Sequence, residues 1–205
     1  MGLATEQIRD DLDALCLIEP RYIAALAQVG YPEPRSRPKG YATLFRTIVG
    51  QQVSAKAADA VWARLEAALG DITNPSAVIA STDEALRACG LSRQKQGYVR
   101  SLAELVASGG LPLDALPLDD EEAIALLMQV KGIGRWSAEV YLLFAEGRRD
   151  IWPAGDLAVQ ADVGMILGLA ERPSEKQVRD LAESWRPYRG AAAIFAWHHY
   201  NTPGI

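Results

Sequence analysis

The chain has 205 residues, of which 49% are hydrophobic and 23% are charged, and its formal net charge is −5 at pH 7. This composition is that of a globular protein with a substantial core, and it excludes a disordered chain. It also excludes a protein that coats nucleic acid through an overall positive charge, so any contact with DNA must be local. The acidic start MGLATEQIRDDLD does not resemble a secretory signal, and no apolar run of about eighteen residues occurs. We expect a cytoplasmic monomer without membrane contact, associated with the nucleoid if the source is a bacterium.

Apolar residues recur at helical spacing along nearly the whole chain, as in Tyr41, Leu44, Phe45 and Ile48. No stretch shows the sustained alternation that is typical of strands. We therefore predict an all-α fold of about ten helices. Capping and breaking signals mark their boundaries: Ser81 with Glu84, Ser174 with Gln177, Asp119, Gly70 and Gly90.

The segment GYPEPRSRPKG, from Gly30 to Gly40, is the longest predicted connection, because its three prolines and flanking glycines interrupt a helix. It separates an N-terminal helical pair from the main body. Soon after it comes FRTIVGQQVSA, in which Gln51 and Gln52 precede a helix that Ser54 can cap. From the residues alone, the two glutamines lie in a solvated turn or contact a ligand. Lys95, in LSRQK, has a solvated, folding or binding role.

The segment from Leu127 to Phe144 (LMQVKGIGRWSAEVYLLF) has a helical apolar stripe that Gly-Ile-Gly interrupts. Two helices must therefore pack across a tight turn. We expect Gly132 and Gly134 to supply unusual backbone torsions and Ile133 to fill the space between the helices. Free amide groups at the start of the second helix suit an anion such as a DNA phosphate. The alternative is an ordinary helical hairpin.

After this hairpin comes the segment DIWPAGDLAV, which carries Asp156 directly before a helical sequence. Asp156 can simply cap that helix. It can also stabilise the positive charge that develops on a sugar when a glycosidic bond breaks, which an ionised carboxylate in a water-poor pocket does well. Both readings remain open on the residues alone.

Together, VKGIGRWSA, the order of Pro153, Gly155 and Asp156, and the C-terminal segment RPYRGAAAIFAWHHY resemble the helix-hairpin-helix (HhH-GPD) DNA glycosylases, in particular the AlkA-type 3-methyladenine DNA glycosylases. The resemblance covers roughly residues 40–200. It implies one glycosylase unit over 1–205 with two helical lobes and an active site in the cleft between them. One lobe would comprise 1–38 and about 160–205. The other would comprise about 39–155, with the hairpin at 119–144.

By this resemblance Asp156 is the catalytic carboxylate. Bifunctional relatives, which also nick the backbone, carry a nucleophilic lysine at the position of Trp136, and an indole cannot form a Schiff base. We therefore expect a monofunctional hydrolase without abasic-site lyase activity. Trp136 and Trp197 are expected to line the base pocket, since aromatic faces attract cationic bases. Val140 stands where AlkA has a pocket tyrosine, and Tyr141 follows it.

The resemblance also assigns a DNA-contacting set. Gln52 is the residue that would enter the gap left by a flipped nucleotide, where AlkA has leucine, and Gln51 lies beside it. The other expected DNA-binding residues are Lys95, Lys131, Gly132, Ile133, Gly134 and Arg135.

No cofactor is expected. Cys16 and Cys89 lack the spacing of an iron-sulfur or zinc site, and His198 and His199 diverge on a helix by about 100°. By resemblance, a potassium or sodium ion at the hairpin would be held by main-chain carbonyls of Gln129, Lys131 and Ile133.

The sequence thus predicts an enzyme of base excision repair that flips alkylated bases (3-methyladenine, 7-methylguanine) out of double-stranded DNA and excises them. The alternatives are a glycosylase for deaminated or oxidised bases and a hairpin protein that binds DNA structure without cutting it.

Overall fold

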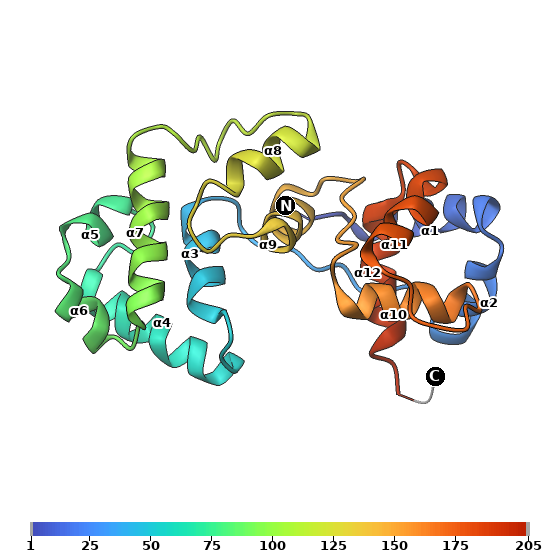
Figure 1. Cartoon of the computed structure of the whole chain (residues 1–205), viewed down its shortest axis with the longest axis horizontal. Coiled ribbons are helices and arrows are strands. Elements are labelled where there is room, and N and C mark those ends of the chain that lie inside the picture. Colours follow the sequence, from blue (N-terminus) through green and yellow to red (C-terminus); the bar gives the residue numbers. More distant parts are fainter. Residues whose placement is uncertain (1, 204–205) are drawn as a thin grey trace. The chain divides into compact units, whose positions relative to one another are not determined.

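The regular structure of the chain is entirely helical over residues 2–203, which a computed structural model describes. These residues form twelve α-helices, a π-helical turn and a 3-10 turn, and no strand (Figure 1). The all-α prediction is confirmed, with two more helices than the estimate of about ten. Within this described range, no helix is both long enough and apolar enough to cross a membrane.

The chain divides into two compact units. Unit 1 comprises Met1–Arg37 and Glu139–Ile205, and unit 2 comprises Pro38–Ala138. The chain first passes from unit 1 to unit 2 between residues 37 and 38, within the predicted connection at 30–40, which has no helix. The chain returns from unit 2 to unit 1 between residues 138 and 139, inside a helix, whereas the boundary was expected at about 155–160. Residues 139–159 therefore group with the terminal helices rather than with the hairpin.

Unit 2 contains the hairpin. Its helices are α3 (Tyr41–Gly50), α4 (Ala55–Leu69), α5 (Pro75–Ala80), α6 (Asp83–Ala88), α7 (Arg93–Ala107), α8 (Asp120–Leu127) and the start of α9 (Arg135–Tyr141). Helix α7 contacts α3, α5 and α6. The core of the unit includes Leu44, Phe45, Ile48, Leu65 and Leu102, all fully buried. Leu44, Phe45 and Ile48 recur at the helical spacing that the sequence shows for α3. Because α7 contacts three other helices, it is the central helix of the unit.

Unit 1 contains the C-terminal helices. It comprises α1 (Thr5–Ile18), α2 (Arg21–Val29), the end of α9, the π-helical turn Leu142–Glu146, α10 (Leu157–Ile166), α11 (Glu175–Leu181), the 3-10 turn Ala182–Trp185 and α12 (Arg189–Tyr200). Helix α12 contacts both α10 and α1. The core of unit 1 contains several aromatic rings. The Tyr22 ring lies edge-on to that of Trp185, with 5.3 Å between the ring centroids, and its centroid is 5.8 Å from that of Phe195.

Most predicted caps are present. Ser174 and Gln177 form a reciprocal capping box at α11, and the Asp119 carboxylate accepts from the Glu122 amide at 2.9 Å. Gly70 closes α4. The Ser81 prediction is wrong by one residue: Thr82 caps α6 through its hydroxyl, which accepts from the Ala85 amide, whereas Ser81 ends α5.

Candidate active site

The hairpin turn connects α8 to α9 through residues 128–134 and has a left-handed glycine at its tip. Gly132 has φ +84°, a conformation that favours glycine. Gly134 is outside the left-handed region, so the expectation of unusual torsions at both glycines holds only for Gly132. Ile133 is buried, and its amide donates to the Val130 carbonyl at 3.0 Å. A β-carbon added to Gly134 would point into open space, with nothing within 4 Å beyond its chain neighbours.

Two residues of helix α7 contact this turn. A β-carbon at position 132 would overlap the Tyr98 ring, so the ring packs directly on the glycine. The Tyr98 hydroxyl in turn accepts from Gln94 at 2.5 Å. One turn further along the helix, the Ser101 hydroxyl accepts from the Lys131 amide at 3.1 Å. The turn is therefore fixed by packing as well as by its own hydrogen bonds.

The two predicted glutamines have different environments. Gln51 donates from Nε2 to the Gly132 carbonyl at 2.8 Å, which joins the end of α3 to the hairpin. Gln52 is exposed and has φ 55°, so a non-glycine residue is held in the left-handed region at the tip of the turn. Such strain persists only where the surroundings impose it and is frequent at functional sites.

Lys95 has a supporting position in this structure. Its ammonium donates to the Val49 carbonyl in the last turn of α3 at 2.7 Å, where a cation also opposes the negative end of the helix dipole. Partial burial lowers the pKa of Lys95. Lys95 thus fixes the helix end that precedes Gln51 and Gln52.

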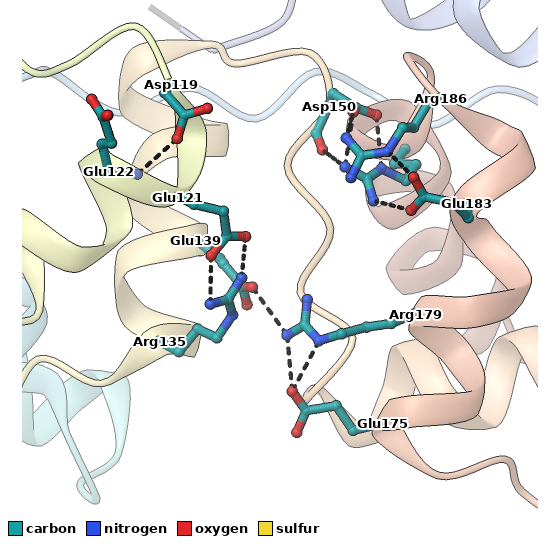
Figure 2. Close-up of polar contacts among 11 residues, drawn as sticks. Asp119, Glu121, Glu122, Arg135, Glu139, Asp150, Glu175, Arg179, Glu183 and Arg186 are labelled. Carbon is teal, nitrogen blue, oxygen red and sulfur yellow. Dashed lines mark hydrogen bonds and ion pairs between the residues drawn. The ribbon is translucent and has the colours of Figure 1, made fainter.

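The two basic residues beside the turn also differ. Lys131 is exposed, whereas Arg135 forms a two-point ion pair with Glu121 of α8, one of whose contacts measures 2.8 Å (Figure 2). Trp136 follows Arg135 in α9, and 47% of its surface is exposed.

Asp156 lies at the N-cap of α10. Its Oδ1 accepts from the Ala158 amide at 2.8 Å and from the Val159 amide at 3.1 Å. The capping interpretation of this residue is therefore true. It does not compete with a chemical role, because the two amide donors fix the orientation of the carboxylate.

The loop before Asp156 is anchored by buried hydrogen bonds. Gln160 donates to the Ala154 carbonyl at 2.8 Å, and the Asp156 amide donates to the Pro153 carbonyl at 2.9 Å. Trp152 donates from its indole to the Val178 carbonyl at 3.2 Å, and its ring lies edge-on to Trp185 at 5.6 Å. A loop held at three points presents its carboxylate in one geometry.

The beginning of the same loop is held by charge. Asp150 accepts from Arg186 at 2.6 Å, and Glu183 also pairs with Arg186 (Figure 2). Arg189 donates to Asp150 at 2.8 Å and lies 3.7 Å from Glu183. Arg189 is nearly buried, which makes this ion pair stronger than a typical surface pair. Gly190 packs so closely on the Arg149 carbonyl that a β-carbon would lie 2.5 Å away, so only glycine fits there.

The remaining predicted pocket residues lie in unit 1. Trp197 of α12 is half-buried, with its ring 5.5 Å from that of Phe144. Tyr141, at the end of α9, is buried. Glu139, also buried, pairs with Arg179 at 3.3 Å, and Arg179 pairs with Glu175 at 2.8 Å (Figure 2). The base-pocket roles of Trp136, Trp197 and Tyr141 stay predictions.

The residues that support the site were not predicted from the sequence. Tyr98 and Ser101 behind the hairpin, and Trp152, Gln160 and Arg189 around the acid loop, have no local signature. Gln160 comes nearest to having one, because a polar residue in an otherwise apolar helix start indicates a buried hydrogen bond.

Comparison with known proteins is consistent with this arrangement. Residues 45–187 match the family model described as HhH-GPD superfamily base excision DNA repair protein. The chain therefore belongs to the HhH-GPD superfamily.

Individual relatives are similar over most of their length. The chain is 35% identical over 161 residues to DNA-3-methyladenine glycosylase 1 of Schizosaccharomyces pombe, covering 77% of this chain and 71% of the relative. Its structure resembles that of a DNA-3-methyladenine glycosidase from Bacillus halodurans, with a TM-score of 0.86, 29% identity, and coverage of 94% and 89% of the two chains. The S. pombe 3-methyladenine DNA glycosylase Mag1, in complex with abasic DNA, has a TM-score of 0.76, 30% identity, and coverage of 93% and 95%.

Proposed function

We propose that this protein is a DNA glycosylase that flips alkylated bases out of double-stranded DNA and hydrolyses their N-glycosidic bonds, with Asp156 as the catalytic carboxylate. The observation that carries the proposal is Asp156 itself, an acid held at the start of α10 by two amide donors on an anchored loop. The relatives named as 3-methyladenine glycosylases, one of them in complex with abasic DNA, support the same substrate class.

Cleavage of the glycosidic bond of an alkylated base requires few catalytic groups besides the Asp156 carboxylate. Cleavage of the bond leaves positive charge on the deoxyribose, and a fixed carboxylate stabilises that charge without reorganisation. Alkylation makes a base such as 3-methyladenine or 7-methylguanine a good leaving group, so a dedicated general acid is not required. The same carboxylate can orient the attacking water.

The enzyme is proposed to stop at the abasic site. Trp136 occupies the position of the Schiff-base lysine of bifunctional relatives, and its indole has no nucleophilic amine. Borohydride treatment of the enzyme with abasic-site DNA checks this point. We expect no covalent enzyme–DNA adduct, whereas a trapped adduct would show that another amine acts as a lyase.

The hairpin is proposed to hold the DNA backbone, with a monovalent cation bound to its main chain. Its ligands would be the main-chain carbonyls of Gln129, Lys131 and Ile133, which lie in the turn between α8 and α9. A bound ion there would add positive charge at the turn, which suits a phosphate contact in a chain whose net charge is −5.

A panel of duplexes tests the substrate class. Each duplex carries one lesion: 3-methyladenine, 7-methylguanine, hypoxanthine, uracil or 8-oxoguanine. We expect release of the methylated purines at rates well above those of the other bases. Preferential release of hypoxanthine, uracil or 8-oxoguanine would instead assign the enzyme to deaminated or oxidised bases, and binding without any release would indicate a structural DNA-binding protein.

A further inference from the structure

A polar pair lies in the apolar core of unit 1. Asp162 of α10 is fully buried and His199 of α12 is 4% exposed, and their Oδ1 and Nδ1 atoms are 2.5 Å apart. The imidazole stacks on Phe195 at 5.6 Å between ring centroids. The hydroxyl of Tyr22, a residue that also packs on Phe195, and the Asp162 Oδ2 are both buried without a hydrogen-bond partner in the described part of the chain.

A buried polar pair fills a core at a cost in folding free energy. Burial of a carboxylate with one oxygen unpartnered carries a desolvation penalty, and apolar residues of similar volume are often at least as stabilising as a buried ion pair. Burial raises the pKa of Asp162 to about 6, although the hydrogen bond with His199 opposes this. The pair instead specifies how α10 and α12 pack, because its single short hydrogen bond forms in only one register of the two helices.

Those two helices carry residues of the candidate site. Asp162 is six residues after Asp156 in the same sequence segment, so it lies roughly 9 Å along the α10 axis from the cap. His199 is two residues after Trp197 on α12. A shift of α10 along or around α12 would displace the Asp156 carboxylate relative to Trp197.

We propose that the buried His199–Asp162 hydrogen bond is a positioning element that sets the place of the Asp156 carboxylate relative to Trp197. The inference rests on the proposed function of Asp156. A displacement of about 1 Å in a reacting group can slow a reaction by about 100-fold, so the pair affects catalysis without contacting DNA. Its removal should lower the rate of bond cleavage and leave DNA binding nearly unchanged.

The test uses a variant that removes both polar groups. His199→Leu alone would leave a buried, unpaired carboxylate and destabilise the fold. The double variant His199→Leu/Asp162→Leu avoids that problem. His199→Asn is the conservative variant, because its amide nitrogen takes the place of Nδ1 and keeps the hydrogen bond. Leu15→Ala is the control, since Leu15 is a fully buried residue of α1 whose truncation destabilises the same unit and leaves both polar groups in place.

Single-turnover excision of a methylated purine, affinity for an abasic-site duplex and thermal unfolding are measured for each variant. We expect the double variant to fold, to bind within about 3-fold of wild type, and to excise about 10- to 100-fold more slowly. His199→Asn should retain the rate within about 3-fold, and Leu15→Ala should lose stability but keep the rate.

Two results would overturn the positioning role: wild-type excision by the double variant, or equal slowing by Leu15→Ala. Failure of the proposed function is distinguishable from both. In that case Asp156→Asn would excise at the wild-type rate, whatever the double variant does.

Discussion

Gln51 donates a hydrogen bond to the carbonyl of Gly132, and this 2.8 Å contact joins the turn after α3 to the hairpin that is proposed to hold the DNA backbone. The neighbouring Gln52 has no such contact among the described hydrogen bonds and is exposed at φ 55°. The two adjacent glutamines therefore differ: Gln51 fixes the turn, whereas Gln52 is exposed, as its proposed insertion into DNA requires.

This division predicts different defects for the two positions. Gln52→Ala should leave the free energy of unfolding within about 0.5 kcal/mol of wild type and slow excision about 10-fold, because the side chain that fills the gap is lost. Gln51→Ala should cost about 1 kcal/mol of stability through the lost hydrogen bond. Denaturant unfolding and single-turnover excision measure both. Slower excision by Gln51→Ala with unchanged stability would instead make Gln51 a DNA contact.

The two hairpin glycines offer a matched pair of substitutions. Gly132→Ala places a β-carbon against the Tyr98 ring and forces alanine to φ +84°, where the backbone conformation alone costs roughly 1–2 kcal/mol. Gly134→Ala enters open space at an ordinary φ and should leave stability almost unchanged. Thermal unfolding separates them. Equal destabilisation by both variants would mean that the turn differs from the geometry described.

Glu121 is expected to compete with DNA phosphate for Arg135. Glu121→Gln should therefore strengthen binding to undamaged duplex by about 2- to 5-fold at low salt, the range expected for an exposed ion pair. Glu122→Gln is the control, because it removes the same charge from the same helix without freeing Arg135. Fluorescence anisotropy over a salt series measures the affinities. If both variants bind equally tightly, only net charge matters.

Much of the site can be predicted because its signals are local. Gly-Ile-Gly followed by Arg-Trp, and Pro-Ala-Gly-Asp before a helix, each lie within one short segment. The supporting contacts cannot be predicted in this way, since Gln51 and Gly132 are 81 residues apart and Asp162 and His199 are 37 apart. The boundary at which the chain returns to unit 1 could not be predicted either, because no local signal marks it. It lies inside α9, whose sequence has no glycine or proline at that point.

Asp162 predicts a distinct pH dependence of stability. Its folded pKa of about 6 lies above the unfolded value of about 4, so the protonated form favours folding. That contribution is full below about pH 4 and is lost as the pH rises through 6. Asp162→Asn cannot titrate, and relative to wild type it should therefore gain stability between pH 4 and pH 7, by roughly 3 kcal/mol at most. Urea unfolding across this range measures the difference. A constant difference would show that Asp162 ionises at its ordinary pKa.

Catalysis is proposed to depend on the charge of Asp156, and Asp156→Asn isolates that charge. Asparagine caps helices as well as aspartate does, so this variant should keep the fold and the affinity for an abasic-site duplex. Only the negative charge that is proposed to act on the sugar is lost. The decisive measurement is the single-turnover rate of methylated-purine release by the two proteins. We expect a loss of at least about 100-fold in the variant. Release at the wild-type rate would mean that Asp156 is only a helix cap.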